Sequence, residues 1–310
     1  MELLPGPGCP VCVVPAKEID EAIFLAKQEN VILATFGDMT RVPASYSSLW
    51  KARAEGANVK IVYSPIDAVQ LAKKYKDKEV VFFSVGFETT APGVASLILN
   101  DPPENFSILC SHRLIPPIME LLLGIGDLHI DGFICPGHVA TIIGVKPFEI
   151  FADAYNMPTV IAGFEPADIL IAVLMILKQI VTNDIKCENE YLRCVKYEGN
   201  VKAQETMNEV FVPVSAHWRG IGRVPKSGFS LRKPYENFDA RKKFDIRLEH
   251  QSRDILPGCS CHLVLIGKIY PPQCKLFGKV CTPASPYGPC MVSQEGTCRI
   301  WFKFRRQMNQ

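Results

Sequence analysis

The chain has 310 residues, of which 48% are hydrophobic and 21% are charged, and its formal net charge at pH 7 is +2. This is the composition of a folded soluble protein with a length typical of about two or three domains, and the weak charge excludes a general basic field for nucleic acid or an anionic membrane. The N-terminus has no basic region followed by an apolar run, so we expect no secretory signal and a cytoplasmic protein.

Helix-like and strand-like runs alternate from residue 16 to about residue 182. Short, nearly all-apolar strands between helices are typical of a parallel sheet covered on both faces. We therefore predict an α/β fold. The predicted elements are helix 17–28, strand 31–36, helix 67–75, strand 80–85, helix 115–124, strand 131–135, strand 159–164 and helix 169–181.

Two strand ends carry the same Gly-Phe-Glu tripeptide, in "VGFETTAPGV" (85–94) and "AGFEPADILI" (162–171). The repeat suggests two related units, although a chance match of three residues explains it equally well. Open α/β sheets bind ligands at the carboxyl ends of their strands, so Glu88 is a candidate site residue. Its alternative role is that of a carboxylate at a helix start, favoured by the helix dipole.

Later segments are less regular. The helix at 169–181 begins with nine uninterrupted apolar residues, too few to span a bilayer, and we predict that it is buried. Segment 187–211 has a helical pattern, whereas 217–235 is basic and loop-like and is interpreted as a structural or partner-facing loop. We predict two similar parallel-sheet α/β domains, at 1–110 and 111–235, and a small cysteine-rich domain at 236–310.

The first chemical motif is "GPGCPVCVVP" (6–15), which holds Cys9 and Cys12. Proline and glycine resist regular structure, so a shaped loop is predicted around the pair. A Cys-x-x-Cys pair either binds a metal, cycles between dithiol and disulfide, or consists of two unreactive thiols.

Six of the twelve cysteines lie within the forty residues 259–298. A cytoplasmic location makes a disulfide framework improbable there. Structural zinc sites usually have two tight Cys-x-x-Cys knuckles, which this segment lacks, whereas an iron–sulfur cluster accepts thiolates from separate loops. The pattern favours a cluster over zinc or inert thiols, and a bound centre would help to stabilise this Pro- and Gly-rich end.

Six stretches of the chain together carry a family resemblance. They are "GPGCPVC" (6–12), "GFETTAP" (86–92), "GFICPGHVA" (132–140), "GFEPADIL" (163–170), "WRGIGRVPKSG" (218–228) and "CSCHLVLIGKIYPPQCKLFGKVCTPASPYGPCMVSQEGTC" (259–298). These stretches resemble the HypD family of hydrogenase maturation factors, which helps to build the iron centre of [NiFe]-hydrogenases. They cover nearly the whole chain in order, and the last is long and specific.

The resemblance implies two similar α/β domains and a third domain with a [4Fe–4S] cluster. It implies that Cys9 and Cys12 are a redox-active thiol pair. The cluster ligands that it implies are Cys259, Cys274, Cys281 and Cys298, with Cys261 as the alternative to Cys259.

The same resemblance implies partners and a cargo. A small chaperone, HypC, and the chain together would hold an Fe(II) ion while carbon monoxide and two cyanide ligands are installed. Cyanide would come from HypE, fed by HypF, and the hydrogenase large subunit would be served indirectly. The chain would thus be a redox-active assembly scaffold rather than a conventional turnover enzyme, and iron with such ligands needs soft donors and electrons.

Further candidates are less specific. His138 and Cys135 lie in the "CPGHVA" stretch, where either could approach an iron site or simply be packed in the core. Glu295 is either a group near the cluster or a solvated side chain. The family's Cys-Gly-Thr-His motif is not found in this sequence, which begins eight residues before Cys9, so the expected iron-holding cysteine is missing from it.

Two other functions stay open. A stand-alone thiol–disulfide oxidoreductase would use the Cys9/Cys12 pair on external substrates, but no thioredoxin-like context follows the motif. A zinc-stabilised binding module would have no chemistry of its own. The colour of the purified protein distinguishes the zinc module from the iron–sulfur scaffold, since a zinc protein is colourless and a [4Fe–4S] protein is brown.

Overall fold

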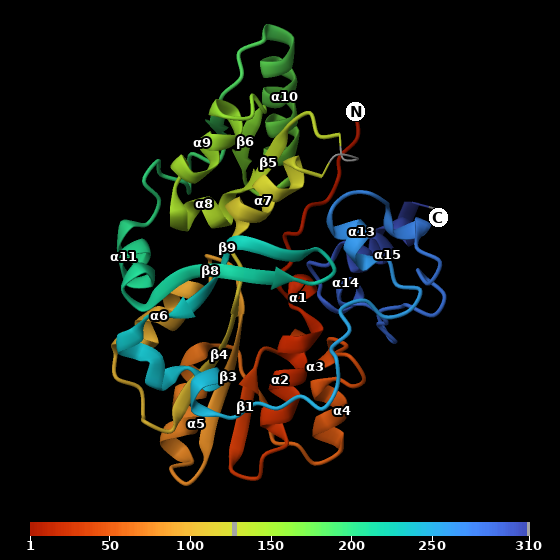
Figure 1. The fold of residues 1–310 in the computed structure, drawn as a ribbon. Coiled ribbons are helices and arrows are strands. Elements are labelled where there is room, and N and C mark those ends of the chain that lie inside the picture. The colour runs from red at the N-terminus through yellow and green to blue at the C-terminus, as the bar shows by residue number, and fades with distance from the viewer. Residues whose placement is uncertain (126–128, 309–310) are drawn as a thin grey trace.

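The computed structural model describes residues 1–125 and 129–308, with side chains through residue 304. Two parallel sheets and one antiparallel hairpin form its frame, and a compact cysteine-rich segment lies beside the hairpin (Figure 1). Among the described residues, every helix is too short or too polar to pass through a bilayer. The predicted α/β class with a cysteine-rich end is confirmed.

The first sheet has four parallel strands in the order β2-β1-β3-β4. The elements of this unit are α1 (Pro10–Val13), α2 (Ala16–Ala26), β1 (Val31–Thr35), α3 (Gly37–Arg41), α4 (Leu49–Ala54), β2 (Val59–Ile61), α5 (Pro65–Lys74), β3 (Glu79–Gly86), α6 (Ala91–Leu99) and β4 (Phe106–His112). Successive side chains of a strand point to opposite faces. Val81 and Phe83 therefore pack with α2 and α4, whereas Val80 and Phe82 pack with α5 and α6.

The second sheet has three parallel strands in the order β5-β6-β7. Its elements are α7 (Ile115–Leu123), β5 (Phe133–Pro136), α8 (Gly137–Ile143), α9 (Lys146–Asp153), β6 (Thr159–Ala162), α10 (Pro166–Thr182), β7 (Cys187–Asn189) and α11 (Val201–Val210). Val160 and Ala162 pack against α10, whereas Ile161 joins Phe148 and Phe151 on the other face.

The prediction that the helix at 169–181 is buried is wrong. Along α10, only Asp168, Ala172 and Gln179 are buried. Leu170 is 70% exposed and Leu174 is 66% exposed. The reason is the narrow three-stranded sheet, which α10 contacts along a single stripe. No other element of the described chain covers its outer face (Figure 1).

The prediction of a loop over 217–235 is also wrong. This segment holds the end of β8 (Phe211–Trp218) and all of β9 (Gly222–Leu231), which pair antiparallel. A register shift between Val214 and Ala216 and a left-handed Lys226 (φ 49°) interrupt the two-residue period by which strands are recognised. The hairpin runs between the two α/β units (Figure 1).

The C-terminal part consists of short helices and turns. Its elements, with the two that connect it to the hairpin, are η1 (Lys233–Phe238), α12 (Ala240–Lys243), α13 (Cys261–Leu265), η2 (Pro271–Gln273), α14 (Pro289–Val292) and α15 (Thr297–Met308). Helix α14 packs against α1, so a segment near the start of the chain contacts one near its end (Figure 1).

The exposed face of α10 makes a prediction about stability. Leu174→Gln should change the free energy of unfolding by less than about 0.5 kcal/mol, because that side chain is already in water. Ala172→Gln should destabilise the protein by about 1–3 kcal/mol, because Ala172 is fully buried against Val160. Urea unfolding of both variants measures this difference, and equal losses would show that the outer face is covered.

Candidate functional site

Cys9 and Cys12 form a disulfide that closes the single turn of α1. Pro10 presets the backbone at the first helical position, and the Cys12 N–H donates to Cys9 Sγ at 3.2 Å. The predicted loop is thus a one-turn helix after the Gly-Pro-Gly segment. Cys9 is 3% exposed and Cys12 is 0% exposed, so solvent does not reach either sulfur freely.

The disulfide lies where the first sheet, the hairpin and the cysteine-rich segment meet. Helix α1 packs on the carboxyl end of β3 and on α14. Phe87, directly after β3, and Trp218, at the end of β8, stack with ring centroids 6.1 Å apart and belong to the same apolar cluster as both cysteines. The Arg219 N–H donates to the Val13 carbonyl at 2.8 Å, which ties the hairpin to the end of α1.

Five cysteines of the C-terminal segment gather into one sulfur group. The Sγ atoms of Cys259 and Cys261 are 3.2 Å apart, and the Cys290 thiol forms hydrogen bonds with Cys261 and Cys298. The Tyr287 N–H donates to Cys281 Sγ at 3.4 Å. The members of the sulfur group are Cys259, Cys261, Cys281, Cys290 and Cys298.

The sulfur group differs from the predicted ligand set at two positions. Cys274 lies at its edge, with its Sγ 4.0 Å from the carbonyl of Gly258, the residue before Cys259. Cys290 belongs to the group, although sequence reasoning gave it no role. Its only signal in the sequence was its place among the six cysteines of 259–298.

Gly288 lets the backbone approach the sulfur group closely. A Cβ atom at this position would lie 2.4 Å from Cys261 Sγ and 2.8 Å from Cys259 Sγ. Real Cβ atoms do not come so near to other heavy atoms, so any larger residue would displace the two sulfurs. Glycine here allows the backbone to pack directly against the sulfurs of Cys259 and Cys261.

Hydrogen bonds between sulfurs separate the pKa values of two thiols. Hydrogen bonds with Cys261 and Cys298, together with burial, raise the pKa of Cys290 well above its usual range. Hydrogen bonds from Cys261 and Cys290 lower the pKa of Cys298 to about 5. One buried thiol therefore keeps its proton while its neighbour is held as a thiolate, the form that binds metals.

The sulfur group fits an iron–sulfur cluster in its chemistry. Within residues 1–125 and 129–304, no three His, Cys, Asp or Glu side chains converge as ligands of a single metal ion. A [4Fe–4S] cluster instead takes one thiolate at each of four irons, so its ligands are spread apart. An all-sulfur donor set has the composition that such a cluster requires.

Glu88 is buried at the carboxyl end of β3. Its Oε1 accepts the N–H of Ile115, the first residue of α7, at 2.8 Å, and its Oε2 has no partner among the described residues. Glu88 therefore sits at a helix start, as predicted, but it supports α7 rather than the α6 that follows it in the chain. Burial raises the pKa of Glu88 to about 7.

The other predicted candidates differ in their surroundings, and of the three only Cys135 belongs to the apolar cluster that contains Cys9 and Cys12. His138 is exposed at the start of α8, with its ring 4.6 Å from that of Phe164. Cys135 is buried in β5, and burial raises its pKa well above the usual range, with a further contribution from Cys187. Glu295 is exposed. None of the three has a hydrogen bond or ion pair with Cys9 or Cys12 in the described part of the chain.

The two Gly-Phe-Glu loops have different surroundings. Both follow a parallel strand, β3 and β6, as predicted. Phe87 and Glu88 are buried under the hairpin, whereas Phe164 is 63% exposed and Glu165 caps α10. Only the first loop therefore lies at the junction with the disulfide.

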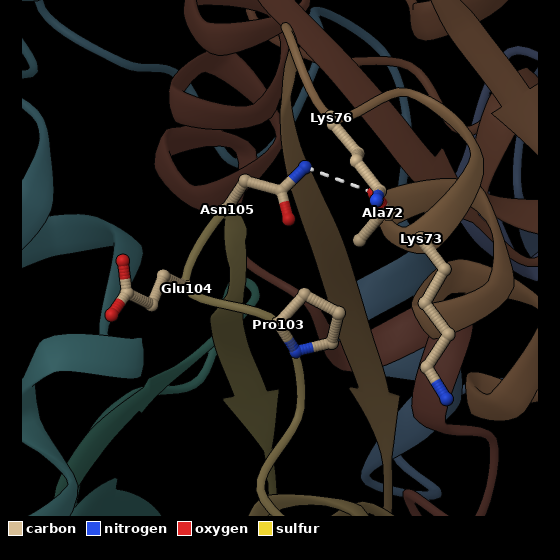
Figure 2. A pocket seen from close by; sticks show the side chains of 6 residues that line it. All are labelled: Ala72, Lys73, Lys76, Pro103, Glu104 and Asn105. Carbon is tan, nitrogen blue, oxygen red and sulfur yellow. Dashed lines mark hydrogen bonds between the residues drawn. The ribbon is translucent and has the colours of Figure 1, made fainter.

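The two best-formed surface pockets lie elsewhere. The larger has a volume of about 550 Å³, and Figure 2 shows that its Asn105 side chain turns toward Ala72, whose carbonyl accepts a hydrogen bond at 3.0 Å. The second, of about 420 Å³, lies between the N-terminal residues and η2. Neither is lined by a cysteine. The residues lining the larger pocket are Ala72, Lys73, Lys76, Pro103, Glu104 and Asn105.

Comparison with known proteins identifies the family. The family model described as "HypD: Hydrogenase formation hypA family" matches residues 1–305. The chain belongs to the HypD family of hydrogenase maturation factors. The resemblance inferred from the six sequence stretches is thereby confirmed.

Relatives within the HypD family align with almost the whole chain. A putative hydrogenase expression/formation protein of Methanocaldococcus jannaschii is 50% identical over 308 residues, which are 98% of this chain and 85% of that protein. The hydrogenase maturation factors HypD2 of Bradyrhizobium diazoefficiens and HypD of Azotobacter vinelandii are each 45% identical over 317 residues, 99% of this chain and 83% of each relative.

The burial of Glu88 predicts a pH dependence. The folded chain holds the pKa at about 7, above the 4.5 of an exposed glutamate, so between these values the folded state keeps a proton that the unfolded state has released. The free energy of unfolding should therefore fall as the pH rises through this window.

Glu88→Gln keeps an acceptor for the Ile115 N–H but cannot ionise. The stability of Glu88→Gln minus that of the unsubstituted chain should therefore be more favourable at about pH 8 than at about pH 5, by on the order of 2 kcal/mol. Denaturant unfolding of both proteins at the two pH values measures this gain. A difference that does not change with pH would contradict a buried, proton-holding Glu88.

Proposed function

We propose that this HypD family member is an iron–sulfur scaffold with a redox-active thiol pair that serves the assembly of the hydrogenase iron centre. The observation that carries the proposal is the packing of α1, with the Cys9–Cys12 disulfide, against α14, which contains Cys290 of the sulfur group. A disulfide and a group of converging thiols thus share one buried environment.

Cys259, Cys281 and Cys298 of the sulfur group would hold a [4Fe–4S] cluster, and Cys274, next to Gly258, would be the fourth ligand. When bound, such a cluster supplies single electrons at a potential set by burial, charge and hydrogen bonds. Cys261 and Cys290, also in the sulfur group, remain as thiols beside it. Cys261 is the alternative to Cys259 as a ligand.

The Cys9–Cys12 disulfide accepts electrons in this proposal. Reduction breaks the S–S bond, takes up two electrons and two protons, and yields two thiols. The electrons would come from the cluster, recharged by an external reductant. Once reduced, Cys9 and Cys12 would be soft ligands for an Fe(II) ion, the substrate of the assembly reaction.

Partner proteins complete the assignment. Membership of a maturation-factor family implies work with other maturation proteins. We propose a HypC-type chaperone that shares the Fe(II) ion, HypE as the source of cyanide with HypF upstream of it, and transfer of the finished iron centre, with its carbon monoxide and cyanide ligands, to the hydrogenase large subunit.

A stand-alone oxidoreductase is disfavoured by burial. An enzyme that exchanges disulfides with external proteins needs an accessible attacking sulfur. Here Cys12 is 0% exposed and Cys9 is 3% exposed. A zinc-stabilised module remains the other reading of the sulfur group, and metal analysis separates it from a cluster.

Anaerobic purification followed by iron, zinc and acid-labile sulfide analysis tests the cluster. We expect about four irons and four sulfides per chain with broad absorption near ~400 nm. Cys281→Ser and Cys298→Ser should lose most of the iron, whereas the exposed Cys194→Ser should keep it. Comparing Cys259→Ser with Cys261→Ser identifies the first ligand. Stoichiometric zinc without colour would overturn the cluster.

The thiol pair is tested by a hydrogenase maturation assay. Cys9→Ser and Cys12→Ser should each lower maturation at least about tenfold while the iron and sulfide content stays unchanged, because neither residue is a cluster ligand in the proposal. Cys194→Ser is the matched control for loss of a thiol. Full maturation by Cys9→Ser would remove the pair from the mechanism.

A further inference from the structure

Helix α10 carries two apolar stripes on opposite faces. The inner stripe packs against the second sheet and holds Ala172, Met175 and Ile176. A residue two positions away from a buried one lies roughly 200° further round an α-helix, so Leu170 and Ala172 face in opposite directions. The members of the outer stripe are Leu170 (70% exposed), Leu174 (66%), Leu177 (43%) and Val181 (84%).

The outer stripe has the spacing of a coiled-coil seam. Its members are separated by four, three and four residues, the alternation that keeps the a and d positions of a heptad on one side of a helix. An ordinary surface helix instead turns polar residues toward solvent. Between residues 169 and 181 the only polar side chains are Lys178 and Gln179, and Gln179 is buried. The outer stripe therefore has the pattern of a helix that packs against another helix.

The outer stripe is complementary to itself. Its four-three-four spacing reads the same in both directions, so two copies of α10 can lie antiparallel about a two-fold axis between Leu174 and Leu177. Leu174 of each copy then faces Leu177 of the other. Leu170 likewise faces Val181, so every contact of the seam is apolar and Lys178 lies beside it. The opposed helix dipoles favour this antiparallel arrangement over a parallel one.

We propose that the outer stripe of α10 is an interface between two copies of this chain, which associate as an antiparallel, two-fold helix pair. Helix α10 lies at the end of the molecule opposite the first sheet, where a second copy can approach it (Figure 1). This association is independent of the iron–sulfur cluster and of the thiol pair.

The interface is small, because one helix from each copy supplies it. It belongs to the class below about 1,200 Å², in which association is weak and reversible. We expect the chain to be dimeric at roughly 100 µM and monomeric at about 1 µM, because so small an apolar area little exceeds the cost of association. In the monomer Leu174 is in water, which is the state to which the unfolding prediction for Leu174→Gln refers.

Sedimentation equilibrium of the chain over a range of concentrations tests the proposal. Leu174→Glu sets a carboxylate against Leu177 of the second copy, and Leu177→Lys sets an ammonium against Leu174, so each should raise the dissociation constant of the dimer at least about tenfold. The double variant sets Glu against Lys in the antiparallel register and should bind more tightly than either single variant. Ile66→Glu, which changes an exposed apolar residue of α5, is the matched control and should leave the constant unchanged.

Urea unfolding at a concentration where the chain is monomeric shows that each variant is folded. A dimer that both single substitutions weaken and the double substitution recovers supports the proposal. A chain that stays monomeric at every concentration overturns it, and the outer stripe would then belong to an interface with a different protein. A dimer that Leu174→Glu leaves intact also overturns it, because that dimer would use another surface. Weakening by both single variants without recovery in the double variant overturns the antiparallel pairing.

Discussion

The structure depends on one apolar cluster that joins segments from both ends of the chain. It contains the Cys9–Cys12 disulfide, Phe87 and Trp218, and most of the sulfur group. The C-terminal segment has only short helices and turns, so it buries little apolar surface by itself and must pack against the rest of the molecule to be stable. The packing that stabilises this segment also brings its thiols toward the disulfide.

The hairpin of β8 and β9 is the part that makes this junction rigid. Trp218 is fully buried, stacks on Phe87 and donates its indole N–H to Ser227 Oγ at 2.8 Å. A large aromatic side chain with a satisfied polar atom gives both packing and orientation. The backbone N–H of the next residue, Arg219, donates to the Val13 carbonyl at the end of α1, and the adjacent Gly220 packs closely against His262 of α13. One turn of the hairpin therefore contacts both α1 and the cysteine-rich segment.

Two buried polar atoms near this junction have no hydrogen-bond partner among the described residues. Most buried polar groups in folded proteins are hydrogen-bonded, so exceptions require a reason. Glu88 Oε2 and Arg219 Nη1 are two such atoms, at the carboxyl end of β3 and in the turn of the hairpin. Glu88 lies at the carboxyl end of β3, the end at which open α/β sheets generally bind ligands.

The sequence by itself determined the α/β class, the order of most helices and strands, the family and the existence of a cysteine-rich end, because apolar periodicity and motif spacing are local properties of the chain. It did not reveal the β8–β9 hairpin, whose alternation is broken by a register shift, nor the exposed face of α10, since the apolar content of a helix does not say which neighbours cover it. Tertiary structure alone decided that Cys290 joins the sulfur group while Cys274 lies at its edge. These features arise from contacts between residues far apart in the chain, and no local pattern encodes such contacts.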